Sequence, residues 1–131
     1  MIHIDKGAVA EYHFAAELLD RGITPNWPST ESRPYDIIAD TGLARYRVQV
    51  KGTVKSGSII DVQFTMKTGK KKRRYSKDEV DFIALHVFEN KSWYIFPIDD
   101  VESAVRIRPG NPQCKNKIYL EAWHLISGRE K

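Results

Sequence analysis

An acidic, an amide and a basic side chain lie on two neighbouring stretches that are typical of β-strands. Asp36 comes near the start of the first stretch, and Gln49 and Lys51 occupy alternate positions on the second. Residues two apart on a strand share a face, and a hairpin between the strands can bring Asp36 beside them. Such oxygen ligands suit Mg²⁺, which binds few carboxylates and keeps several waters. The spacing favours a divalent-cation site with an ammonium group alongside, to which the Val50 carbonyl could add an oxygen. A solvated strand face with a turn acid is the alternative interpretation.

Metal-assisted hydrolysis of a phosphodiester needs these parts. The ion polarises the phosphoryl oxygen and lowers the pKa of a bound water. A neighbouring lysine can orient or help deprotonate that water, or stabilise charge in the transition state, and the sequence leaves these roles open. Glu11, on or beside the apolar stripe of the first predicted helix, could approach the site if that helix packs on the sheet. A salt bridge at the edge of the core is its alternative role.

The elements that must position these residues begin with a helix. Asp5 can cap it and Gly22 can end it. Apolar residues recur between them at helical spacing: Val9, Tyr12, Ala15, Ala16, Leu18 and Leu19. Residues 23–34 indicate a loop or irregular strand because prolines interrupt them. Strands are predicted over 35–39, 44–51 and 59–66, as a meander that a basic turn over 67–74 closes.

The second half of the chain predicts further strands and short helical pieces. Ser76 and Glu79 match a capping box, so a helical turn is expected there. The apolar run 82–88 suits a central buried strand, followed by a strand over 92–96. A helical turn over 99–103, an edge strand over 105–108 and a helix within 119–126 complete the chain. This order predicts one α/β or α+β domain over residues 1–131 with a mixed sheet.

Basic side chains are concentrated in one short segment. No acid interrupts the run, which comprises Lys67, Lys70, Lys71, Lys72, Arg73, Arg74 and Lys77. At physiological salt the Debye length is ~8 Å, so such a dense patch acts as one field on a polyanion. Contacts of this kind with phosphates give affinity without reading sequence. The run therefore predicts a DNA-binding surface, with a solvated basic loop as the alternative.

Composition excludes several classes of protein. The chain has 131 residues and a formal net charge of +4, which fits one compact domain. Its single cysteine, Cys114, cannot form an internal disulfide or a cysteine zinc cluster, which favours a reducing, cytoplasmic setting. No apolar run approaches the ~20 residues of a membrane span. A secreted disulfide scaffold, a zinc finger, a membrane protein and a repeat array are thereby excluded.

The motifs together resemble the PD-(D/E)XK nuclease superfamily. The resemblance rests on Gly7-x-x-x-Glu11, Pro34-Tyr35-Asp36 and Gln49-x-Lys51. Segments 46–51, 81–84 and 93–97, with the basic turn, are similar to small phage and cyanobacterial enzymes grouped with group I intron homing endonucleases. Chain length and the interval from Asp36 to Lys51 are similar to archaeal-type Holliday junction resolvases.

The resemblance implies a restriction-endonuclease-like α/β fold, a mixed sheet flanked by helices. It places Glu11, Asp36 and Lys51 at the family's acidic and lysine positions, with Mg²⁺ as cofactor, Mn²⁺ as its substitute and DNA as substrate. Gln49 replaces the usual acid, as in the intron-encoded branch. An amide keeps an oxygen but removes a charge, so metal binding is expected to be weaker.

Three functions follow as expectations. The first is a structure-selective Holliday junction resolvase, because the chain has no room for an extra recognition domain. Symmetric cutting of two strands implies a homodimer, with a tetramer as the alternative. The second is a homing endonuclease that cuts a specific duplex site and reads base edges. The third is a non-catalytic DNA-binding module. The expected location is the cytoplasm of a bacterial or phage-infected cell.

Overall fold

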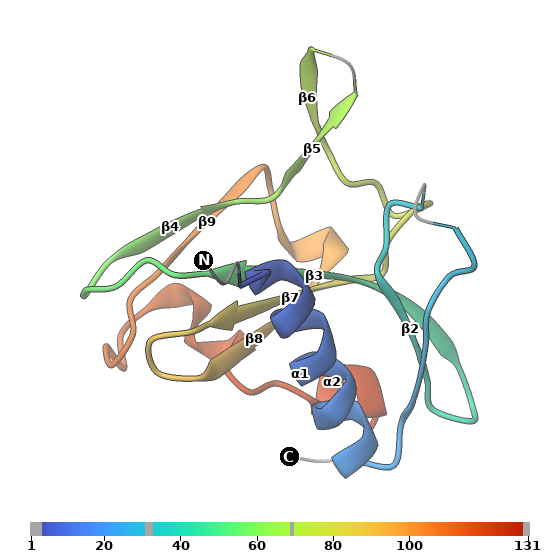
Figure 1. The fold of residues 1–131 in the computed structure, drawn as a ribbon. Helices are drawn as coiled ribbons and strands as arrows, with labels where there is room; N and C mark the ends of the chain where they lie inside the picture. Colours follow the sequence, from blue (N-terminus) through green and yellow to red (C-terminus); the bar gives the residue numbers. More distant parts are fainter. Residues whose placement is uncertain (1–3, 31–32, 69, 130–131) are drawn as a thin grey trace.

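The computed structural model describes residues 4–30, 33–68 and 70–129, and a mixed five-stranded sheet lies at its centre (Figure 1). The strand order is β1-β2-β3-β7-β8. These strands are β1 (Thr24–Asn26), β2 (Ile37–Asp40), β3 (Arg45–Thr53), β7 (Phe82–Val87) and β8 (Ser92–Pro97). Only the β3–β7 pair among them is parallel. The predicted mixed sheet flanked by helices is thereby confirmed.

Helix α1 (Lys6–Asp20) packs on one face of this sheet. The Asp5 carboxylate accepts a hydrogen bond from the Ala8 N–H at 3.1 Å, and Gly22 has a φ of 75° after the last turn. Both predicted helix ends are therefore confirmed. The predicted apolar face was partly wrong, because Tyr12, Ala16 and Leu19 are exposed. The buried stripe comprises Ala10, Phe14, Ala15 and Leu18.

The central sheet separates two hydrophobic clusters. The α1 side holds Val48 and Val50 of β3 together with Trp93. The opposite side holds Ile83 and Leu85 of β7, covered by the antiparallel pair β4 (Ile60–Gln63) and β9 (Ala104–Ile107). Every residue of β7 is buried because both of its faces are covered. The prediction of a central buried strand over this run is confirmed.

The predicted strand over 59–66 was wrong, since two strands occupy this region. β4 ends at Gln63, and β5 (Thr65–Thr68) pairs with β6 (Lys71–Arg74) as a separate hairpin. Phe64, between the two strands, is fully buried, and its N–H donates to the Ser103 carbonyl at 2.7 Å. The buried Phe64 thus separates the β4–β9 pair from the β5–β6 hairpin. The meander is therefore replaced by β4–β9 pairing, and the basic turn by a β-hairpin.

Two short helical pieces, η2 (Lys115–Tyr119) and α2 (His124–Ser127), lie where one helix was predicted over 119–126. A further piece, η1 (Ile98–Asp100), lies at the helical turn predicted over 99–103. Glu121 has a φ of 49°, a left-handed conformation that interrupts a continuous helix. Trp123 and Ile126 still bury their side chains in the α1-side cluster. Within the described ranges, no helix has the length and apolar character that crossing a membrane requires.

Candidate active site

Asp36 lies immediately before β2, opposite the middle of β3. Its backbone N–H donates to the Val48 carbonyl at 2.9 Å, and its carboxylate Oδ2 accepts from the Val50 N–H, also at 2.9 Å. Burial raises the pKa of the Asp36 carboxyl, while the Val50 N–H and the charge of Lys51 act in the opposite direction. The strand pairing thus fixes one carboxylate in a half-buried position beside β3.

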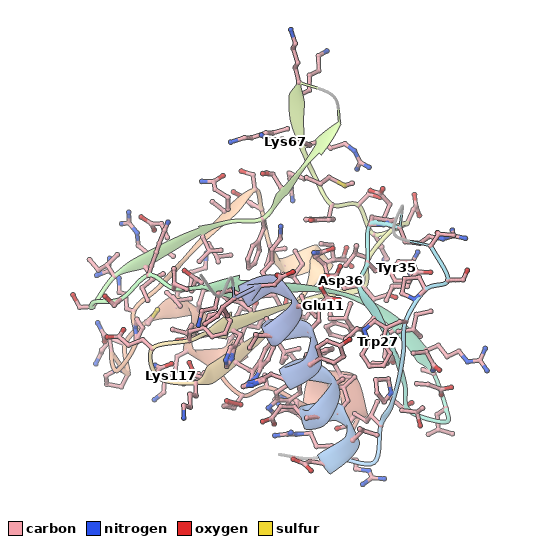
Figure 2. The ribbon with its side chains drawn as sticks, in the orientation of Figure 1. Glu11, Trp27, Tyr35, Asp36, Lys67 and Lys117 are labelled. Atoms are coloured by element: carbon pink, nitrogen blue, oxygen red, sulfur yellow. The ribbon has the colours of Figure 1, made fainter. Side chains whose placement is uncertain are left out.

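Glu11 reaches the same place from α1. Both acids line a cavity of about 350 Å³, and Figure 2 shows Glu11 on the helix next to Asp36. The pKa of Glu11 is raised, first by burial, then by the negative charges of Asp36 and Asp5. The helix thus places Glu11 beside Asp36. Because the negative charge of Asp36 disfavours ionisation of Glu11, a cation at this place would relieve repulsion.

Lys51 faces the side of the sheet opposite α1 and lies over an aromatic ring. Its Nζ is 5.3 Å from the centre of the Tyr75 ring, a cation–π distance. Burial lowers the pKa of Lys51, and the charge of Asp36 partly opposes this effect. Asp36 therefore interacts electrostatically with both Glu11 and Lys51, so these three charges converge.

Gln49 alternates with Val48 and Val50 along β3, as the strand pattern predicted. Val50 is buried towards α1, whereas Gln49 is half-buried. The Gln49 Nε2 donates to the Val50 carbonyl at 3.3 Å. The Val50 oxygen, predicted as an additional metal ligand, therefore already accepts a hydrogen bond from its neighbour.

The donor set is small but fits a hard cation. The part of the chain that the structure describes contains no group of three or more His, Cys, Asp and Glu side chains that could hold a metal. Two carboxylates with raised pKa values face one cavity, and an amide side chain and a carbonyl lie on the adjoining strand. Mg²⁺ needs few carboxylates because waters complete its coordination. These residues therefore suit an open Mg²⁺ site that keeps bound waters, and they do not form a closed cage of protein ligands.

The basic residues divide into two groups. The β5–β6 hairpin projects from the body of the protein (Figure 1), and Lys67 and Lys72 are direct cross-strand partners on it. Its outward lysines are Lys67, Lys70, Lys71 and Lys72, all of them exposed.

The remaining three basic residues make contacts within the protein. Both Arg73 Nη atoms donate to the Glu79 carboxylate at 2.6 Å, and Arg74 Nη2 donates to the Val101 carbonyl at 2.8 Å. Lys77 Nζ is 3.4 Å from an Asp99 oxygen. These contacts hold the base of the hairpin, so the lysines near its tip form the more available surface for a polyanion.

Two aromatic residues also lie at the site. From its place in the basic segment, Tyr75 could stack or bond to a phosphate, with a core tyrosine as the alternative interpretation, and its ring both packs against the second cluster and faces Lys51. Trp27 was assigned no role, although it lines the cavity that holds Glu11 and Asp36. The proline-flanked segment around Trp27 has no hydrophobic period, so no sequence pattern pointed to this placement.

Comparisons with known proteins agree with this architecture. The bacterial homing endonuclease I-Ssp6803I is similar to this chain with a TM-score of 0.78 and 25% sequence identity, covering 94% of this chain and 91% of its own. A Holliday junction resolvase, Hjc of the archaeal hyperthermophile Archaeoglobus fulgidus, gives a TM-score of 0.58 and 16% identity over 97% of this chain and 99% of its own. The second likeness shows a shared fold alone. No curated protein matches the chain.

A family model provides the remaining comparison. The model of the PD-(D/E)XK endonuclease matches residues 1–126, which include the acids of the cavity, the lysine of β3 and the basic hairpin. The expected resemblance is confirmed over nearly the whole sequence: this chain belongs to the PD-(D/E)XK endonuclease family.

Proposed function

We propose that the protein is a divalent-metal-dependent endonuclease that hydrolyses phosphodiester bonds in DNA. The observation that carries the proposal is the convergence of Glu11, Asp36 and Lys51 at the start of β2. Family membership supports nuclease chemistry. The projecting hairpin supports a polyanionic substrate, since its lysines are exposed and neither of its two strands contains an acidic residue.

Asp36 and Glu11 would hold the metal ion, with the Gln49 amide oxygen and the Val50 carbonyl as further oxygens. Mg²⁺ is the proposed ion and Mn²⁺ its substitute, because both take oxygen ligands. When bound, such an ion polarises a phosphoryl oxygen and lowers the pKa of a bound water. Asp36 is kept in place by the Val50 N–H, so its carboxylate is oriented before any ligand arrives.

Lys51 supplies a positive charge that interacts electrostatically with Asp36. Its lowered pKa makes the Lys51 proton easier to lose than that of an exposed lysine, which assists proton transfer, whereas the ammonium form would stabilise charge in the transition state. Asp36 and the Tyr75 ring both favour the ammonium form. Burial and the Asp36 charge therefore act in opposite directions on the pKa of Lys51.

The proposed substrate is duplex DNA. I-Ssp6803I, a homing endonuclease, shares more sequence identity and a higher TM-score with this chain than the resolvase does. A four-way junction, the first expectation from the sequence, is the alternative substrate. A two-fold homodimer is proposed for either substrate, because two symmetric strand cuts need two sites.

Cleavage assays test the proposal directly. The protein is incubated with Mg²⁺ and labelled linear duplex, and in parallel with a four-way junction of the same sequence. Cutting of the duplex at one sequence supports the proposal, whereas paired cuts confined to the junction would favour the resolvase. Binding without cutting in either Mg²⁺ or Mn²⁺ would refute the nuclease and leave a DNA-binding module.

Matched variants test the site itself. Asp36→Asn and Lys51→Ala are each expected to abolish cutting while DNA binding persists. Asp40→Asn, at the other end of β2, and Lys55→Ala, beyond the end of β3, are the controls, since their side chains contact Arg45 and the Asp61 carbonyl instead. Wild-type turnover in Asp36→Asn or Lys51→Ala would remove these residues from the site.

A further inference from the structure

An exposed tryptophan lies at the entrance of the active-site cavity. Trp27 is 47% exposed, a large apolar surface to leave in water, and it belongs to neither hydrophobic cluster of the described chain. Its ring centre is 6.1 Å from that of Tyr12, with the planes tilted by 45°. Tyr12 follows Glu11 on α1, so the helix that supplies a catalytic acid also supports the tryptophan.

The cavity beside Trp27 combines flat, apolar walls with acceptors. Trp27, Pro28 and Tyr35 provide the apolar part, and the polar part comprises the Glu11 and Asp36 carboxylates with Thr30 and Arg33. Figure 2 shows Trp27 and Tyr35 on the same side of the molecule as the two acids. A nucleobase offers a π-face that can stack on the Trp27 ring, which a phosphate does not, and the two carboxylates stay available to the proposed metal ion.

We propose that this cavity receives the nucleobase next to the cut phosphate and that this base stacks on Trp27. This inference rests on the proposed function. Base–aromatic stacking is tolerant of sequence because every base has a π-face. A base in a duplex must leave its stack to enter such a pocket. The enzyme therefore acts on DNA that is locally unstacked at the cleaved step, and Trp27 is the residue that holds the displaced base.

A cycle of two perturbations tests this stacking. The cut is mapped first with wild-type protein, and each nucleotide flanking it is then replaced in turn by an abasic analogue. Binding of every substrate is measured in EDTA for wild type and Trp27→Ala, with Trp27→Phe as the conservative variant and Leu43→Ala as an exposed control. Leu43 is 99% exposed in the turn after β2, away from the start of that strand.

Removal of the stacked base is expected to weaken wild-type binding about 5- to 150-fold, as alanine substitutions of stacking residues do. Trp27→Ala is expected to bind intact DNA more weakly than wild type by a similar factor. With the abasic substrate, Trp27→Ala and wild type are expected to bind equally, while Trp27→Phe retains most of the wild-type affinity for intact DNA. Losses that multiply at every position, or Trp27→Ala binding like Leu43→Ala, would overturn the inference.

Two further outcomes are decisive. If Trp27→Ala does not fold, the wild-type abasic scan decides alone, and equal binding at all positions refutes the stacked base. If wild type cuts DNA but the affinity losses from Trp27→Ala and from the abasic substitution are independent, this inference is overturned and the proposed nuclease function stands. Failure of wild type to cut any DNA overturns the proposed function, and this inference with it.

Discussion

Replacement of Tyr75 by leucine is expected to lower the pKa of Lys51. The ammonium lies 5.3 Å from the ring centre. Cation–π attraction ranges from about 0.5 kcal/mol at an exposed site to about 2 kcal/mol at a desolvated one. Lys51 is half-buried, which places it within that range, and about 1.4 kcal/mol corresponds to one pKa unit. Loss of this attraction should therefore lower the pKa of Lys51 measurably. Leucine is chosen because it keeps an apolar side chain over the lysine and so preserves much of the burial that already lowers this pKa.

The assay follows lysine side chains that carry a ¹³C label at Cε by NMR during a pH titration. The Lys51 signal is identified by its loss in Lys51→Ala. Tyr75→Phe is the matched control because it keeps the ring and removes only the hydroxyl, so its Lys51 should titrate as in wild type. Equal titration midpoints in the leucine and phenylalanine variants would refute the role of the ring. A higher midpoint in the leucine variant would show that admitted water outweighs the lost attraction.

Three further changes have defined outcomes. In salt titrations of duplex binding, the slope of log K against log[salt] should become shallower by about 0.9 for each phosphate-contacting lysine that is changed to glutamine, and an unchanged slope would exclude the hairpin lysines Lys67, Lys70, Lys71 and Lys72 from the interface. The Arg73 guanidinium lowers the pKa of Glu79 to about 2, so this pair stabilises the fold above the unfolded pKa of about 4.5 and the effect is lost as pH falls towards 2. Because the pair is partly exposed, Glu79→Gln should lower the free energy of unfolding by only about 1 kcal/mol at pH 7, and denaturant titrations should find no difference from wild type near pH 2. Gln49→Glu adds a negative charge beside the proposed ion and should tighten Mg²⁺ binding in calorimetry, and weaker binding would exclude this side chain as a ligand.

Local signals in the sequence predicted the elements that carry the site. The alternation along β3 placed Gln49 and Lys51 opposite Val50, and the structure buries Val50 against α1 while Lys51 faces Tyr75. The Asp5 cap and the buried run of β7 were equally clear, because each depends on residues close in sequence. Such features need no knowledge of the rest of the fold.

Local sequence patterns did not predict which strands pair when they are far apart in the sequence. β4 and β9 are distant in sequence, and their short alternating patterns fit several partners. Whether β4 continued into β5 depended on Phe64, which is buried against Phe96 of β8, a contact that only the assembled core specifies. Tyr12 was assigned to the helix core from its spacing, yet it pairs with Trp27 at the surface. Both errors come from tertiary contacts that override a local pattern.

The basic hairpin and the site are joined by a short, firmly held segment. Arg74 at the end of β6 donates to the Val101 carbonyl at 2.8 Å, and the next residue, Tyr75, covers Lys51. The turn that follows is tied back to β3, since Arg47 Nε and the Arg47 N–H both donate to Asp81 Oδ2 at 3.1 and 2.8 Å. A flexible linker would let the hairpin bind DNA without fixing where the backbone meets Lys51. Because both ends of this segment are anchored to the body of the protein, phosphates held by the hairpin would be kept at a defined offset from the lysine.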